Sequence, residues 1–133
     1  MILGLSVPPD ATILLLDSEP VMRAALHDAL ETAGYLVRTA IDLSEALARL
    51  AETPPDLLIT SPFINSMPGR TAADYLRSKQ NGLPVLVVAG FLEDDRVEVQ
   101  NTVEEFHTFP KPYRREELIA KVKEVLNLAR HKT

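Results

Sequence analysis

Short apolar runs alternate with longer amphipathic stretches along this chain. The first run, Thr12–Leu16, is continuously apolar after its threonine, which is typical of a strand buried on both faces. Ser18 is then a suitable N-cap for a helix whose apolar residues recur at helical spacing until Gly34 ends it. The same alternation predicts further strands at 35–39, 57–59 and 84–89 and a short one ending at 109–111, and further helices at 44–52, 71–79, 93–106 and 114–130.

This alternation predicts the α/β class, with five βα units that form a doubly wound, parallel, five-stranded sheet. Helices are expected to cover both faces of the sheet, and ligands of such sheets bind at the carboxyl ends of the strands. The length and the absence of a repeat or linker predict one domain over 1–133, with an ordered core at about 11–130.

Charge and composition exclude several function classes. The net charge of −5 argues against binding to nucleic acid or to an anionic membrane. The chain has no cysteine, which excludes thiolate metal sites and cysteine nucleophiles. The apolar stretch 1–5 has no basic flank and is soon followed by Pro8 and Pro9, so it is too short for a secretory or membrane-spanning segment. A cytoplasmic protein is expected.

The sequence motifs do not indicate chemistry that depends on a cofactor. The three histidines are scattered over the chain and form no pattern of metal ligands. No glycine-rich loop of the kind that binds phosphate follows a predicted strand. We therefore expect neither a bound metal nor a cofactor.

The residues that follow the predicted strands are the candidates for chemistry, because the carboxyl ends of parallel strands meet at one edge. They are Asp17, Ser61, Ala89 and Lys111. In this arrangement the chain resembles the receiver domains of the response regulators of bacterial two-component systems. Four motifs carry the resemblance over nearly the whole chain: LLLDSEP at 14–20, PDLLI at 55–59 with MPG at 67–69, LPVLVVA at 83–89, and FPKPY at 109–113.

The resemblance implies the flavodoxin-like fold with strand order 2-1-3-4-5, and a role in phosphorelay signal transduction. In the family, two adjacent acids after strand one and a third carboxylate after strand three hold Mg²⁺. The third carboxylate accepts the phosphoryl group, and a hydroxyl after strand four and a lysine after strand five bind its oxygens. Here Asp17 and Lys111 match this pattern, whereas Ser18, Ser61 and Ala89 replace the second acid, the nucleophile and the hydroxyl.

These departures predict a degenerate receiver, or pseudo-receiver, which lacks the phosphoacceptor aspartate and is not an enzyme. Mg²⁺ prefers several hard oxygen ligands in octahedral geometry, and one carboxylate is a poor site. A serine hydroxyl needs a general base before it can act as a nucleophile. The remaining functional role is a protein-interaction module that works without phosphorylation. With the other acids gone, Lys111 is expected to contact Asp17 or a carbonyl at the strand ends.

Two other functions remain open. The first is a weak phosphoacceptor that uses Ser61, Thr60, or Asp17 with Glu19, together with a divalent metal. The second is a flavodoxin-like binder of a small molecule, which would need an anion-binding loop that the sequence does not show.

The loop after the third strand also departs from the family. Pro68 and Gly69 come seven and eight residues after Ser61, later than the family places this turn. Residues 62–65 are therefore expected to reshape the rim of the pocket, with Phe63 or Ile64 covering it.

A partner surface is expected around the fourth helix, the fifth strand and the last helix. Segment 91–105 holds six acids against one arginine, whereas 106–133 holds seven lysines and arginines against three acids. Such a contrast suits either neighbouring segments or the two halves of a homodimer. The expected partners are a histidine kinase, an output domain or a second copy of the chain. The expected contact residues are Phe91, Leu92, Glu93, Asp94, Asp95, Phe109 and Tyr113.

Overall fold

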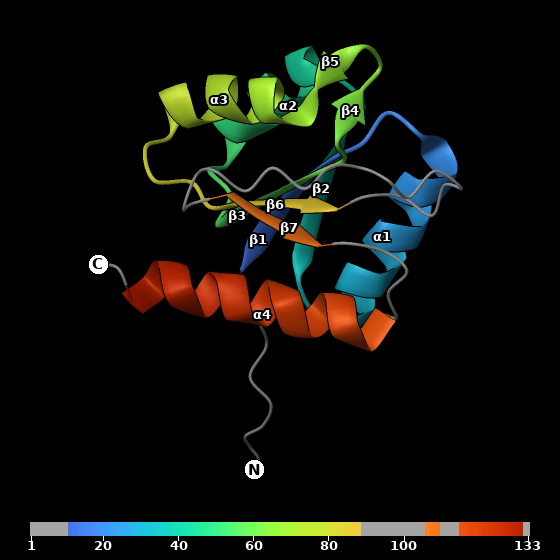
Figure 1. The fold of residues 1–133 in the computed structure, drawn as a ribbon. Helices are drawn as coiled ribbons and strands as arrows, with labels where there is room; N and C mark the ends of the chain where they lie inside the picture. Colours follow the sequence, from blue (N-terminus) through green and yellow to red (C-terminus); the bar gives the residue numbers. More distant parts are fainter. Residues whose placement is uncertain (1–10, 89–105, 110–114, 132–133) are drawn as a thin grey trace.

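A computed structural model describes residues 11–88, 106–109 and 115–131. Five parallel strands form one sheet in the order β2-β1-β3-β6-β7, and a separate pair, β4 and β5, is antiparallel (Figure 1). The order confirms the expected arrangement 2-1-3-4-5. The elements are β1 (Thr12–Leu16), α1 (Pro20–Thr32), β2 (Leu36–Ala40), α2 (Leu43–Glu52), β3 (Leu57–Thr60), β4 (Phe63–Ile64), β5 (Met67–Pro68), α3 (Gly69–Lys79), β6 (Val85–Val88), β7 (Phe106–Phe109) and α4 (Arg115–His131).

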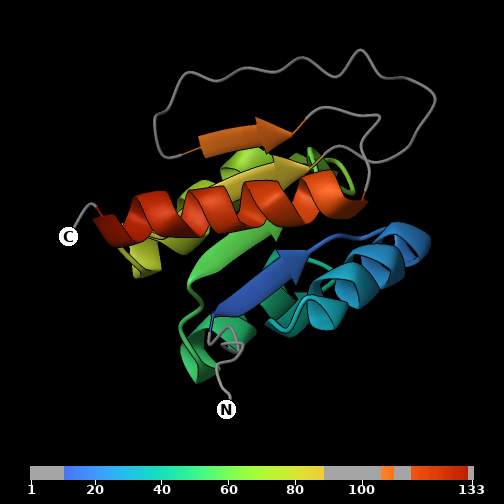
Figure 2. The same ribbon diagram turned by 90° about the horizontal axis from the view of Figure 1, so that it is seen from below.

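Helices α2 and α3 cover one face of the sheet, and α1 and α4 cover the other (Figures 1 and 2). Strand β1 supplies both cores, because successive side chains of a strand point to opposite faces. Ile13 and Leu15 pack in the cluster that α1 and α4 complete, whereas Leu14 and Leu16 pack in the cluster with α2 and α3. This double burial explains why the strand is a continuous apolar run.

The first helix begins differently from the prediction. Glu19, rather than Ser18, is the N-cap of α1, and its Oε1 accepts a hydrogen bond from the backbone N of Met22 at 2.8 Å. Pro20 takes the first helical position, where a missing N–H costs nothing. Gly34 ends the helix as predicted, with φ of 102°.

Helix α2 begins at Leu43, one residue before the predicted start at Ser44. Asp42 caps it, since Oδ1 accepts a hydrogen bond from the backbone N of Glu45 at 2.9 Å. Glu45 Oε1 in turn accepts a hydrogen bond from the backbone N of Ile41 at 2.9 Å. The two reciprocal bonds fix the start of the helix.

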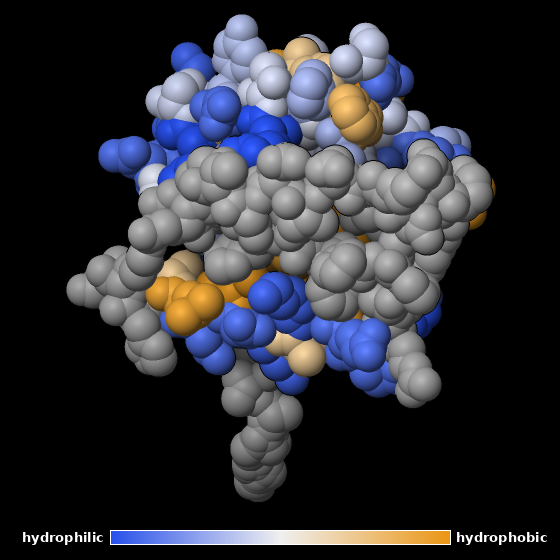
Figure 3. Space-filling view, viewed as in Figure 1, coloured by the Kyte–Doolittle hydropathy of each residue, from blue (hydrophilic) through white to orange (hydrophobic). Residues whose placement is uncertain are grey.

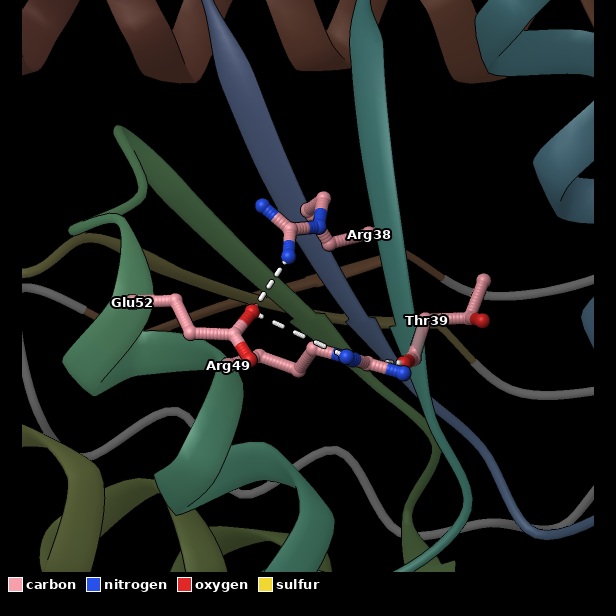
Figure 4. A network of polar contacts seen from close by, with 4 residues as sticks. All are labelled: Arg38, Thr39, Arg49 and Glu52. Atoms are coloured by element: carbon pink, nitrogen blue, oxygen red, sulfur yellow. Dashed lines mark hydrogen bonds and ion pairs between the residues drawn. The ribbon is translucent and has the colours of Figure 1, made fainter.

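A polar network holds α2 beside the edge strand β2 (Figure 4). Arg38, on β2, contacts Glu52 at the end of α2, and Arg49 Nη1 lies 3.7 Å from Glu52 Oε1. Arg49 Nε also donates to the carbonyl oxygen of Thr39 at 3.2 Å. Charged side chains along an edge strand also discourage pairing with another sheet.

The predicted helix at 93–106 lies outside the described residues, apart from Phe106, which begins β7. None of the helices in the described ranges is long and apolar enough to span a bilayer. On the face seen in Figure 3, the described side chains over α3 are mostly hydrophilic, and hydrophobic ones show near the carboxyl-terminal end of α4. Leu128, on that helix, is about half exposed.

Candidate functional site at the strand ends

The ends of β1 and β3 bring two of the candidate residues to one edge of the sheet. The strands are parallel neighbours with Leu16 opposite Thr60, and the backbone N of Ser61 donates to the carbonyl oxygen of Leu16 at 3.2 Å. Asp17 and Ser61, which follow these strands, therefore leave the sheet side by side. Ala89 and Lys111 lie outside the described residues, so the predicted contact of Lys111 with Asp17 stays a prediction.

Asp17 is a buried carboxyl group with 3% of its surface exposed. Its Oδ1 accepts a hydrogen bond from the backbone N of Glu19 at 2.9 Å, and its carbonyl oxygen accepts one from Arg23 Nη1 at 2.9 Å. Burial raises the pKa of Asp17 above 3.8, and the charge of Glu19 raises it further. The hydrogen bond from Glu19 N and the charge of Arg23 lower this pKa and offset part of the rise. Asp17 thus organises the turn between β1 and α1.

The neighbouring acid, Glu19, is also engaged locally. Its carboxylate caps α1, so a turn inward to bind a metal would leave the N–H of Met22 without this acceptor. Across the described ranges, the structure places no group of three or more His, Asp or Glu side chains where it could hold a metal ion.

Ser61 makes a local hydrogen bond that occupies its hydroxyl. Its Oγ donates to the carbonyl oxygen of Phe63 at 2.8 Å, and Thr60 Oγ1 donates to the carbonyl oxygen of Ser61 at 3.0 Å. A carbonyl oxygen cannot take up a proton as a general base does, so this geometry does not activate the hydroxyl as a nucleophile.

The loop after Ser61 forms a small β-hairpin that the sequence analysis did not predict. Phe63 pairs with Pro68 and Ile64 with Met67, across a turn in which Asn65 has φ of 57°. Strands of two residues are too short to give a periodic pattern. The signal that could have indicated them is Asn65, because asparagine tolerates this left-handed backbone region better than most residues.

The hairpin places its two large apolar side chains differently. Ile64 is 3% exposed and joins the core cluster of Leu16 and Leu58, whereas Phe63 is 61% exposed. Ile64 thus packs into the core on the side of α2 and α3, and the expectation that either residue covers the pocket stays a prediction. The turn also reaches the loop between β1 and α1, where the backbone N of Asn65 donates to Ser18 Oγ at 3.3 Å.

The hairpin closes tightly on the start of α3. The backbone N of Gly69 donates to the carbonyl oxygen of Pro62 at 2.6 Å. A Cβ atom at Gly69 would lie 2.1 Å from the carbonyl oxygen of Ser61, which no real contact allows. Glycine is therefore required at this position by a close approach of backbone to backbone.

The strand order of the sheet and a match to a family model together define the class of protein. The family model for the response regulator receiver domain matches residues 13–123. The chain therefore belongs to the receiver domain family of response regulators.

Individual relatives are similar over most of this chain. It is 32% identical over 125 residues to the transcriptional regulatory protein PrrA of Mycobacterium leprae (strain TN), which covers 92% of this chain and 52% of PrrA. It is 30% identical over 119 residues to the sensor histidine kinase TmoS of Ectopseudomonas mendocina, which covers 87% of this chain and 12% of TmoS. The chain spans about half the length of the regulators that it matches.

Solved structures agree with the fold. The receiver domain of the hybrid histidine kinase CckA superposes with a TM-score of 0.70 at 26% identity, covering 86% of this chain and 98% of that one. NtrX from Brucella abortus gives a TM-score of 0.78 at 23% identity, covering 93% of this chain and 28% of that one. At 23% identity, the similarity to NtrX shows a shared fold and does not by itself show a shared function.

The expected partner surface falls almost entirely outside the described residues. Phe91, Leu92, Tyr113 and the acids at 93–95 are in this category, and Phe109 is described by its backbone as the last residue of β7. The surface therefore stays a prediction.

Proposed function

We propose that this chain is a degenerate receiver domain that acts in phosphorelay-type signalling as a protein-interaction module, without being phosphorylated. The observation that carries the proposal is the position of Ser61. It follows β3 at the edge where the family resemblance places the reactive aspartate, and its Oγ is bonded to the carbonyl oxygen of Phe63.

The ligands of this edge do not suit the Mg²⁺ that the family resemblance implies. Mg²⁺ is held by carboxylates and gives up its water reluctantly. Among the described residues of the edge, the carboxylate of Asp17 already binds the backbone N of Glu19, and that of Glu19 caps α1. Ser18 and Ser61 contribute hydroxyls in place of charged oxygens. The described residues thus do not fit the metal, and no reaction step is assigned to it.

The partners are other proteins of the same signalling class. PrrA is by name a transcriptional regulatory protein, and TmoS is by name a sensor histidine kinase. The match to this chain covers 52% of PrrA and 12% of TmoS. A histidine kinase, an output domain or a second copy of the chain would bind in the cytoplasm, through the surface of Phe91, Leu92, the acids at 93–95, Phe109 and Tyr113.

Light scattering on the purified chain distinguishes a dimer from a monomer. The double variant Phe91→Ser with Leu92→Ser should abolish a dimer built on this surface.

Phosphorylation is tested directly. The chain is incubated with Mg²⁺ and acetyl phosphate, and its intact mass is measured beside that of a receiver that carries all three acids. The expected result is no stable phosphoryl adduct on this chain while the control is modified. An adduct on Ser61 or Asp17 would contradict the proposal and support the weak phosphoacceptor. A stoichiometric beryllofluoride complex at the strand ends would contradict it equally.

A further inference from the structure

The two serines at the strand ends are both hydrogen-bonded to the same hairpin. Ser18, after β1, accepts from the backbone N of Asn65, and Ser61, after β3, donates to the carbonyl oxygen of Phe63. These are the positions where the family resemblance places two carboxylates. The hydroxyls that replace them are therefore used by the protein itself.

The hairpin is built to keep its position. It is paired across its two strands, and Ile64 anchors it in the core below. Its base is closed by the bond from Gly69 N to the carbonyl oxygen of Pro62, at a place where a Cβ atom would not fit. Packing of this kind resists small displacements, because core contacts are dense and do not deform continuously.

We propose that this hairpin is a latch, formed by residues 61–69 together with Ser18, that joins the β1–α1 loop to the end of β3 in place of a bound cation. A cation at this edge would link the same two loops through carboxylates. The latch links them through the covalent chain from Ser61 to Asn65 and the hydrogen bond from Asn65 N to Ser18 Oγ, so the linkage does not depend on the concentration of an ion or phosphodonor. The strand-end edge is thereby held in one arrangement. This inference rests on the proposed function and specifies what maintains the unphosphorylated state.

The latch is tested by removing the Ser18 hydroxyl, and Ser18→Thr keeps a hydroxyl as the conservative control. Ser66→Ala is the matched control, because Ser66 is an exposed serine in the same turn. Backbone hydrogen exchange is followed by NMR on the full chain. In Ser18→Ala, the amide of Asn65 should exchange about threefold faster, toward the low end of what one hydrogen bond supplies, because the bond is exposed and 3.3 Å long. Ser18→Thr and Ser66→Ala should leave its exchange close to that of the unmodified chain.

The latch also predicts a second effect, which a hydrogen bond with only a local role would not produce. In Ser18→Ala, amides of the β1–α1 loop, Glu19 above all, should lose protection together with those of the hairpin. An unchanged Asn65 amide, or faster exchange confined to Asn65 alone, would overturn the latch. Neither result would alter the phosphorylation assay, so failure of the latch and failure of the proposed function are distinguishable.

Discussion

Asp17 is a carboxyl group kept out of water, and its environment fixes the sign of a pH effect. Burial raises the pKa of Asp17 above 3.8 in the folded state. The folded chain therefore keeps the carboxyl group of Asp17 protonated at pH values where the unfolded chain has already released that proton. The contribution of Asp17 to the free energy of unfolding therefore falls as pH rises from 3.8 through the folded-state pKa, and this loss is complete above that pKa.

Asp17→Asn removes this charge and keeps an oxygen that can accept from Glu19 N. We expect the variant to unfold at a higher temperature than the unmodified chain at pH 7, and at nearly the same temperature below pH 3.8. Thermal unfolding across this range measures the difference. The opposite slope, with the unmodified chain gaining stability relative to Asp17→Asn as pH rises, would show that a cation such as Lys111 outweighs the burial.

Alanine substitutions at two glycines distinguish destabilisation by steric crowding from destabilisation by backbone strain. Gly69→Ala should destabilise the fold by about 3 kcal/mol or more, because the new Cβ meets a backbone carbonyl that cannot rotate away. Gly82→Ala is the matched control, since Gly82 has φ of 79° and open space around it. Its cost should be about 1 kcal/mol, the usual penalty for alanine in this region. Urea unfolding of both variants gives the comparison, and equal losses would refute the close approach at Gly69.

At the scale of elements, the start of α2 is fixed by two reciprocal hydrogen bonds, and Asp42 makes the one that caps the helix. Asp42→Ala removes the acceptor of the Glu45 N–H and should cost about 1 kcal/mol. Ser44→Ala, at the residue where the sequence analysis began this helix, should change stability by less than about 0.5 kcal/mol because Ser44 is exposed within the first turn. Chemical denaturation measures both. A larger loss at Ser44 than at Asp42 would mean that the helix begins elsewhere.

The longer elements follow from the sequence because their signals are local and repeated. A buried parallel strand needs apolar side chains on both faces, so Thr12–Leu16 is visible as a continuous run. The N-cap of α1 was predicted wrongly for a tertiary reason. Ser18 is the better local cap, but its hydroxyl accepts from Asn65, 47 residues away, and Glu19 caps the helix instead.

The candidate site, like the helices and strands, could be predicted from the sequence only in part. That Asp17 and Ser61 share an edge follows from strand order, because parallel neighbours end together. The partners of their side chains did not follow, since the two-residue strands β4 and β5 leave no periodic pattern. Spacing alone indicated that the loop was longer, and only the paired backbone shows which side chain it buries.

At the scale of the whole molecule, the response to Mg²⁺ decides whether the strand ends still form a metal site. A ligand that binds only the folded state stabilises it by RT ln(1 + [L]/Kd), which is about 1.4 kcal/mol at a concentration ten times Kd. A site of millimolar affinity would therefore raise Tm by several degrees in about 10 mM Mg²⁺.

We expect the Tm of this chain to be the same in Mg²⁺ and in EDTA, because the described carboxylates of the edge already accept backbone hydrogen bonds. The matched variant is Ser18→Asp with Ser61→Asp, which places acids at the two positions now held by hydroxyls. It should lose stability in EDTA through repulsion among carboxylates that Mg²⁺ then relieves, so its Tm should rise with the ion. A rise in the unmodified chain, absent with the same ionic strength of NaCl, would mean that oxygens beyond the described residues complete a site. A double variant that stays indifferent to Mg²⁺ would mean that the hairpin, rather than the missing acids, keeps the ion out.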